Sequence, residues 1–159
     1  MDRLFYKCTN INININININ ININIMSKYT IECSLGEIID KISILKIKLE
    51  KAEENTDKYN NIKREYESLL SYKENNKKLN NYFDNLYNIN KILWDLEDEI
   101  RLKSSTKTFD QSYINTAEMI HITNDRRYQI KREINLLYKS NFIEEKIFPK
   151  DIIKHKKMN

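Results

Sequence analysis

The sequence predicts an all-α fold, and two observations carry that prediction. The 159-residue chain holds one glycine, Gly36, and one proline, Pro149, whereas sheets and barrels need many turn glycines and prolines. After residue 34, apolar residues recur at alternating spacings of three and four, which is the period of an amphipathic helix. We therefore expect an antiparallel four-helix bundle or paired helical hairpins, preceded by a disordered low-complexity leader.

The leader, residues 1–25, ends in eight copies of the dipeptide Asn-Ile, directly before Met26. Strict alternation is nominally a strand pattern, but asparagine is poor in strands and a perfect two-residue repeat is low complexity. A short AT repeat read in frame encodes such a peptide. We expect these residues to be disordered or not translated, with Met26 starting the folded unit. A self-associating cross-β strand is the alternative.

A capping box predicts the first helix, because Ser34 is followed three residues later by Glu37, just before an apolar run. The apolar stripe of this helix reaches Ala52, so we expect it to end near Asn55. Thr56 can cap a second helix. The expected inward residues of that helix are Tyr59, Ile62, Tyr66, Leu69 and Leu70.

The third helix, after a polar turn at 73–77, has the clearest pattern. Seven consecutive a/d positions are occupied by Leu79, Tyr82, Leu86, Ile89, Leu93, Leu96 and Ile100. After a linker at 103–108, a fourth helix is expected over roughly 109–139, with Tyr113, Ala117, Ile120, Ile134 and Leu137 inward. We expect a helical domain over 26–148 and a basic tail over 149–159. So strict a stripe also favours a homodimer.

The net charge of +4 lies at the ends of the chain. The leader carries +1, the tail carries +3, and the body between them is neutral. Since a nucleic-acid binder usually has a basic stripe on its folded part, nucleic-acid binding is not expected. No apolar stretch reaches the roughly 18 residues of a membrane span, so no membrane partner is expected. Cys8 and Cys33 are too few for a disulfide framework, which favours a cytoplasmic location (host cytoplasm for a viral protein).

Polar side chains form three clusters beside the apolar stripe. They are Glu37, Asp40, Lys41 and Lys48 on the first helix, Asn90, Trp94, Glu97, Asp98 and Arg101 on the third, and Asn124, Asp125, Tyr128, Lys131 and Asn135 on the fourth. One such cluster is typical of a solvated surface, whereas three beside one core favour a shared polar pocket. Their nearly balanced charge suits a salt-bridge network or a site for a phosphorylated ligand better than a bare metal site.

Gly36 and Trp94 each leave two interpretations open. Gly36 occupies the second position of the first helix, where the turn needs no glycine. It is either simply tolerated or allows an anionic group to approach the free N–H groups of the helix start. Trp94 is either half-buried at a helix interface or a stacking platform for a sugar or base.

Four blocks, residues 35–48, 93–101, 124–135 and 144–148, occur in this order at fitting intervals. Together they resemble a family of small uncharacterised helical proteins from bacteria and large DNA viruses, over roughly residues 29–148. The resemblance implies no activity, but the family's genes often lie near glycosyltransferase genes, which is an association only. The residues it carries over as ligand-binding candidates are Gly36, Glu37, Asp40, Lys41, Trp94, Glu97, Asp98, Arg101, Asn124, Asp125, Arg127, Lys131 and Asn135.

These observations predict a binding or accessory protein of glycan metabolism, with no cofactor and with a charged cleft for a phosphorylated sugar, a nucleotide sugar or a partner enzyme. Arg101, Arg127 and Lys131 are expected to meet the phosphate, with Trp94 or Tyr128 stacking. Two alternatives stay open. One is a Mg²⁺-dependent hydrolase of nucleotide phosphates that uses the same carboxylates, and the other is a purely structural module with register-fixing salt bridges. Catalytic residues are not assigned.

Overall fold

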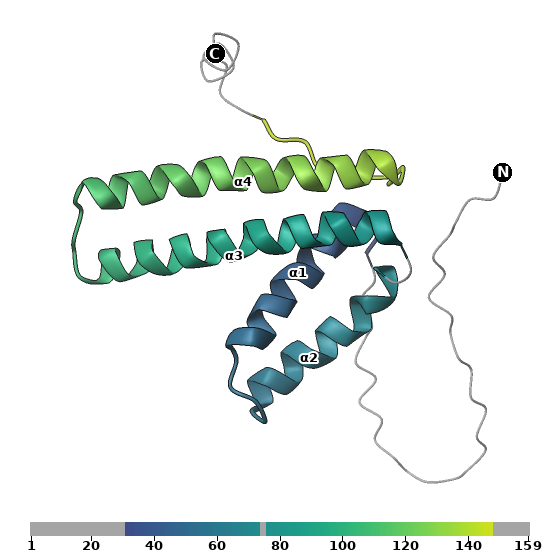
Figure 1. The fold of residues 1–159 in the computed structure, drawn as a ribbon, viewed down its shortest axis with the longest axis horizontal. Coiled ribbons are helices and arrows are strands. Elements are labelled where there is room, and N and C mark those ends of the chain that lie inside the picture. Colours follow the sequence, from purple (N-terminus) through teal and green to yellow (C-terminus); the bar gives the residue numbers. More distant parts are fainter. Residues whose placement is uncertain (1–30, 74–75, 148–159) are drawn as a thin grey trace, which may run out of the picture. The chain divides into compact units, whose positions relative to one another are not determined.

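The structure, a computed structural model, describes residues 31–73 and 76–147. These ranges contain the helices α1 (Leu35–Lys51), α2 (Asp57–Leu69), α3 (Lys77–Ser105) and α4 (Gln111–Leu137), with a short 3₁₀ helix, η1 (Leu70–Tyr72), after α2 (Figure 1). No strand occurs within them. The all-α prediction is confirmed, in the form of two helical hairpins. The Asn-Ile leader and the basic tail lie outside the described residues.

Side-chain caps explain where the helices begin. At each of the four N-termini, the side chain of the preceding residue accepts a hydrogen bond from the backbone N–H three residues later. These caps are Ser34, Thr56, Asn76 and Asp110. The caps predicted at Ser34 and Thr56 are confirmed. The first helix ends at Lys51, earlier than expected, because Ala52 already has extended backbone.

The loops supply left-handed backbone without glycine. Asn55, Lys107 and Lys139 have positive φ angles of 63°, 57° and 51°. Lys107 and Lys139 each follow the C-cap of a long helix, where glycine is the usual residue. The amides of Thr108 and Ser140 then bond back to carbonyls of the last helical turn. Such ends stop α3 and α4 at the cost of a strained lysine at each.

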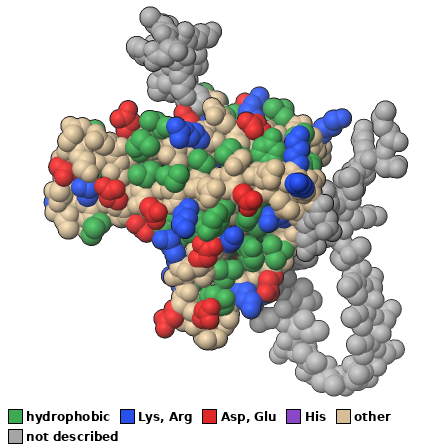
Figure 2. All heavy atoms as spheres, viewed as in Figure 1, with side chains coloured by type: hydrophobic (Ala, Val, Ile, Leu, Met, Phe, Trp, Pro, Cys, Tyr) green, Lys and Arg blue, Asp and Glu red, His purple; other side chains and the backbone are tan. Residues whose placement is uncertain are grey.

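Helix α1 is central to the fold, because it packs against α2, α3 and α4, whereas α2 packs against α1 and η1. Figure 1 shows α1 crossing the first half of α3, while the rest of the α3–α4 hairpin extends beyond it. On the face drawn in Figure 2, acidic and basic side chains are interspersed among the coloured residues. None of the described helices combines the length and hydropathy that a bilayer crossing requires.

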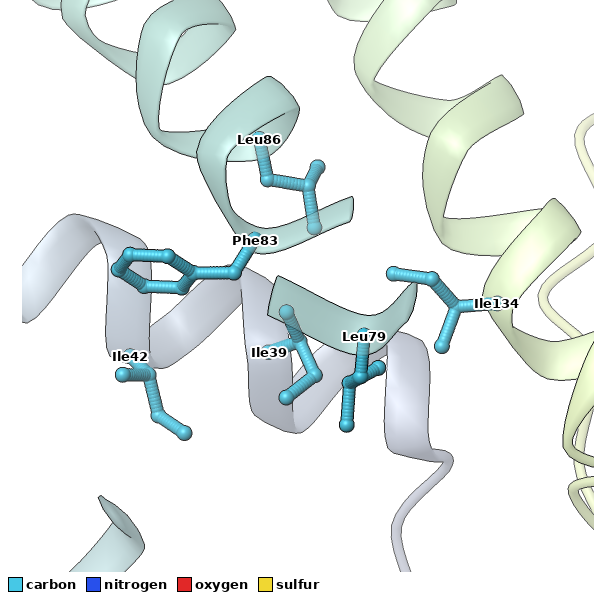
Figure 3. Packing of buried hydrophobic residues seen from close by; sticks show 6 residues of the cluster. All are labelled: Ile39, Ile42, Leu79, Phe83, Leu86 and Ile134. Carbon is cyan, nitrogen blue, oxygen red and sulfur yellow. The ribbon is translucent and has the colours of Figure 1, made fainter. Parts of the chain in front are cut away.

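The hydrophobic core lies where α1 crosses α3 and the last turns of α4 (Figure 3). Six side chains, each at most 3% exposed, form its centre: Ile39, Ile42, Leu79, Phe83, Leu86 and Ile134. Burial of such side chains contributes roughly 1.5–3 kcal/mol each. The same crossing brings the polar residues of α1 and α4 together, so the core positions the candidate site.

The predicted core differs from the observed one in specific places. On α3, Leu79, Leu86 and Leu93 are buried as expected, but Phe83 replaces Tyr82 as the buried aromatic. On α4 the prediction for Leu137 is wrong, since this side chain is 40% exposed. Ile134 and its polar neighbours take the inward positions of the last turns and turn Leu137 towards solvent. The expected homodimer stays a prediction, which sedimentation of the full chain would check.

Candidate functional site

The first turn of α1 lies unusually close to α4, and Gly36 makes this possible. A Cβ atom placed on Gly36 would lie 2.5 Å from the carbonyl oxygen of Lys131 and 2.8 Å from Oδ1 of Asn135. Neither is a flexible side-chain end, because one is helix backbone and the other belongs to a side chain that is 1% exposed. Close helix contact therefore requires the glycine. The structure thus gives Gly36 a packing role, which is neither of the two interpretations that the sequence left open, tolerance and access for an anionic ligand.

Asn135 joins the two helices at the same point. Its Oδ1 accepts a hydrogen bond of 2.7 Å from the Gly36 backbone N–H and another from the Ser140 hydroxyl. A free N–H at the start of α1 is thus satisfied by a side chain of α4 rather than left for a ligand. The Nδ2 atom of Asn135 is buried and has no hydrogen-bond partner among the described residues.

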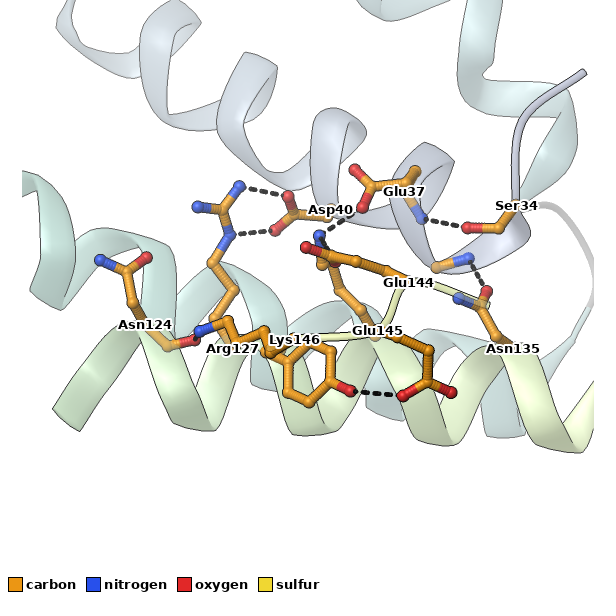
Figure 4. Close-up of polar contacts among 12 residues, drawn as sticks. Ser34, Glu37, Asp40, Asn124, Arg127, Asn135, Glu144, Glu145 and Lys146 are labelled. Carbon is orange, nitrogen blue, oxygen red and sulfur yellow. Dashed lines mark hydrogen bonds and ion pairs between the residues drawn. The ribbon is translucent and has the colours of Figure 1, made fainter. Parts of the chain in front are cut away.

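A buried network connects α1, α3 and α4 one turn further along. It consists of Asp40, Ser43, Asn90 and Arg127. Asp40, 2% exposed, accepts from Nε and Nη2 of Arg127 in a bidentate pair (Figure 4). It also accepts a hydrogen bond from Asn90 Nδ2. Asn90 also donates to the Ser43 hydroxyl at 2.7 Å. The hydrogen bond with Asp40 raises the pKa of Arg127, against the opposing effect of burial. The network joins three helices through side-chain hydrogen bonds.

Lys131 lies beside this network and is 7% exposed. Its Nζ forms ion pairs with two carboxylates, Glu37 of α1 and Glu144 of the segment after α4, the second at 2.6 Å. Burial lowers the pKa of Lys131, but the hydrogen bonds to Glu144 and Glu37 outweigh it and raise the pKa. The bond to Lys131 lowers the pKa of Glu144. Lys131 and Glu144 are therefore held in their charged forms.

Residues 141–147, here called the strap, run back along α4 after its end (Figure 1). Three consecutive strap residues pair with α4: Glu144 with Lys131, Glu145 with Arg132 at 2.7 Å, and Lys146 with Asp125 at 3.0 Å. The Lys146 ammonium also lies 5.2 Å from the ring centroid of Tyr128, within cation–π range. The strap is thus fastened to α4 through side-chain charges.

A small, partly open hollow lies between α4 and the strap. Its volume is about 70 Å³, which is room for about two water molecules. Three cationic side chains and one carboxylate contribute to its wall. The lining residues are Asn124, Arg127, Tyr128, Lys131, Glu144 and Lys146. The cations outnumber the carboxylate in the lining, although Asp40, Glu37 and Asp125 neutralise them from outside the wall.

The structure brings most of the predicted site residues to this region. Eight of the thirteen candidates lie in the Gly36 contact, the buried network, the Lys131 ion pairs or the hollow. These are Gly36, Glu37, Asp40, Asn124, Asp125, Arg127, Lys131 and Asn135. They come from α1 and α4, so these two polar clusters do share one site.

The cluster on α3 does not join them. Arg101 pairs with Glu97 at 2.7 Å and with Asp98 at 3.4 Å, all on the same helix and largely exposed. Trp94 lies under the Lys51 ammonium, with its ring centroid 5.5 Å away. Lys41 points towards α2, where it pairs with Glu65. Because α1 crosses only the first half of α3, the predicted convergence of three helices reaches Asn90 and stops there.

The carboxylates proposed as Mg²⁺ ligands are separated by this arrangement. Asp40 binds Arg127 and Asn90, and Glu37 binds Lys131. On α3, Glu97 and Asp98 bind Arg101. Among the residues that the structure describes, no three His, Cys, Asp or Glu side chains are grouped so that they could hold a metal ion. The hydrolase alternative gains no support from this geometry.

Ser43, Glu144 and Lys146 contribute to the site but appear neither in the three polar clusters nor among the thirteen candidates. Ser43 sits on the inward side of α1, where a serine gives no signal of its own. Glu144 and Lys146 belong to a non-helical segment, to which helical periodicity does not apply. Only the family resemblance, which includes the block 144–148, indicated that this segment could contribute to the site.

Comparison with known proteins adds a family to this geometry. A family described as "Family of unknown function (DUF6165)" matches residues 29–156, about four fifths of the chain. The chain belongs to DUF6165. The match begins after the Asn-Ile leader, as predicted. It extends to residue 156, so the prediction that the family domain ends near residue 148, before the basic tail, was wrong. Neither the curated proteins nor the solved structures contain a match to the chain. All six residues that line the hollow lie within the matched DUF6165 domain.

Proposed function

We propose that this protein is a cytoplasmic binding protein that recognises the phosphoryl group of a sugar phosphate or nucleotide sugar in the hollow between α4 and the strap. The single observation behind the proposal is the convergence of Arg127, Lys131 and Lys146 on one hollow beside Tyr128. Lys146 takes the place that we expected Arg101 to have, and Tyr128, one of the two residues expected to stack, takes the stacking role. Glu37 and Asp40 orient the Lys131 and Arg127 cations through their ion pairs.

The Arg127 guanidinium is preorganised to bind such a ligand. Its bidentate pair with Asp40 uses Nε and Nη2, which leaves the Nη1 amino group for a further acceptor. The planar guanidinium matches phosphoryl oxygens, and holding it rigidly reduces the entropy lost on binding. Lys131 adds a second, nearly buried positive charge. Binding energy here comes from charge-assisted hydrogen bonds to groups already in place.

The size of the hollow limits what enters it. Whole small molecules usually occupy pockets of roughly 300–1,000 Å³, whereas this hollow measures about 70 Å³. Only one anionic group fits, with the rest of the ligand lying over Tyr128 and the surface. Sugars are favoured as the remainder by the glycosyltransferase genes that the family resemblance associates with such proteins, which is support by association.

The test is a thermal-shift and calorimetric screen of the full chain against sugar phosphates, nucleotide sugars and nucleotides, with and without Mg²⁺. Ligand at about 100 times its dissociation constant adds roughly 2.7 kcal/mol, a rise of a few degrees. We expect Lys131→Gln and Lys146→Gln to abolish the shift and Arg101→Gln, a cation outside the hollow, to retain it. A flat panel, or equal loss in Arg101→Gln, would refute the proposal. Mg²⁺-dependent turnover would instead favour the hydrolase.

A structural module is the second candidate, favoured by the complete pairing of Asp40. A buried carboxylate with a bidentate arginine and an amide donor fixes helix register without any ligand. In that case the domain presents its surface to a partner protein, and the cations of the hollow only hold α1 and the strap against α4. The ligand screen separates the two, because only the binding protein gains stability from phosphoryl compounds.

A further inference from the structure

The Lys131 ammonium already has an anionic ligand inside the molecule. Two carboxylates contact its Nζ, from Glu37 and from Glu144, and only Glu144 also lines the hollow. Around a single ammonium, two carboxylates repel each other, so each weakens the hold of the other. One of the two is therefore the easier to displace.

The backbone decides which carboxylate that is. Glu37 lies in the first turn of the 17-residue helix α1, where the helix dipole favours a negative charge. Glu144 lies in the strap, outside any helix, and it lines the hollow. Both carboxylate side chains are 43% exposed, so their different backbone settings, and not their exposure, distinguish them. Rotation about its side-chain bonds moves the Glu144 carboxylate into water without disturbing packed residues. Glu144 is the displaceable partner.

We propose that Glu144 is an internal competitor of the ligand: its carboxylate occupies the position on Lys131 that the incoming phosphoryl group takes, and it swings out when the ligand binds. This inference rests on the proposed function and adds its regulation. The exchange replaces one oxygen anion by another on the same ammonium, so the charge on Lys131 is matched before and after. It also enlarges a hollow that holds about two water molecules while Glu144 is in place.

The strap itself stays on α4 during this exchange. Glu145 and Lys146, the next two residues, keep their ion pairs with Arg132 and Asp125. Lys146 therefore remains in the wall of the hollow and adds its charge to the bound state. The side chain of one residue moves, and the segment that carries it remains in place.

The experiment compares the full-length wild type with Glu144→Gln and Glu145→Gln, using inorganic phosphate as the probe and calorimetry as the measurement. Both variants remove one negative charge from adjacent positions of the strap, so Glu145→Gln controls for general electrostatics. The Glu144 carboxylate is 43% exposed, so solvent screens its charge and it competes only modestly with an incoming anion. We therefore expect Glu144→Gln to bind phosphate about two- to five-fold more tightly than the wild type, and more tightly than Glu145→Gln.

Each other outcome counts against the inference. Equal phosphate affinities in all three proteins, or an equal gain in affinity in both variants, would refute the inference that Glu144 competes with the ligand. The proposed function would not be affected. Absence of phosphate binding in all three would overturn both. Glu144→Gln changes a side chain that is 43% exposed, so the variant folds, and circular dichroism checks this before titration.

Discussion

The backbone carbonyl oxygen of Lys131 occupies the space in which Gly36 would carry a side chain, at 2.5 Å from an added Cβ atom. This contact brings the first turn of α1 against α4. It places Glu37 and Asp40 opposite Lys131 and Arg127. The only glycine of the chain is therefore located where the polar groups of two helices must meet.

Replacing Gly36 with alanine should destabilise the protein. Alanine is the better helix former by about 1 kcal/mol in an unconstrained helix. Here the added methyl group meets the helix backbone and the buried Asn135, so we expect a net loss of about 1–3 kcal/mol, typical of overpacking. Chemical denaturation of the two proteins measures it. A gain in stability would show that α1 and α4 are less tightly packed than described.

Arg127→Met should cost about 3 kcal/mol, because it leaves the carboxylate of Asp40, 2% exposed, with only its amide partner. Adding Asp40→Leu to that variant should recover part of the loss, since no unpaired charge then remains buried. The double-mutant cycle is measured by urea unfolding. Additive losses from the two changes would mean that Asp40 and Arg127 do not interact.

Acid should release Glu144 from Lys131. The folded protein holds the pKa of Glu144 below its ordinary value of about 4.5, mainly through the hydrogen bond from Lys131. A lowered pKa stabilises the folded state above the ordinary value, and this stabilisation is lost as the pH falls through the folded pKa. In a ¹³C NMR titration, the Glu144 carboxyl signal should therefore show a pKa below the ordinary value in the wild type, and one closer to the ordinary value in Lys131→Gln. An unshifted pKa in the wild type, or the same pKa in both proteins, would contradict the ion pair.

Lys107→Gly should stabilise the protein, by about 0.5–1 kcal/mol. Lysine at a φ of 57° carries the strain of left-handed backbone, whereas glycine adopts it freely. The same change at Lys103, inside α3, is the control and should destabilise by about 1 kcal/mol. Thermal denaturation of both variants measures the difference. A loss at position 107 would mean that α3 does not end in the left-handed turn.

The fold was predictable because its signals are local. Ser34 and Thr56 mark the first residues of helices because their side chains can cap a helix N-terminus. The spacing of the apolar residues then identifies the helices that follow. It was harder to predict which face of each helix is buried. A stripe with three- and four-residue spacing is compatible with either Tyr82 or Phe83 pointing inward. Which of them is buried depends on where α1 crosses, and that is a tertiary property.

The candidate site was predictable only in part, for a related reason. Periodicity assigns charged residues to the surface, so the 7% exposure of Lys131 could not be read from α4 alone. Its burial is tolerated because Glu37 and Glu144 arrive from elsewhere in the chain. Conversely, Arg101 and Trp94 share a helical face with Asn90, but Trp94 meets only the Lys51 ammonium at the end of α1 and Arg101 pairs within α3, so neither reaches the site.

The most direct test of the binding proposal is a ¹H–¹⁵N NMR titration of the full-length protein with a sugar 1-phosphate. We predict saturable shifts for Asn124, Tyr128 and Lys131, with the Arg127 side-chain signal moving in parallel, while the indole N–H of Trp94 stays unchanged. Shifts centred on Trp94, or a spectrum that does not respond, would contradict a phosphoryl site between α4 and the strap.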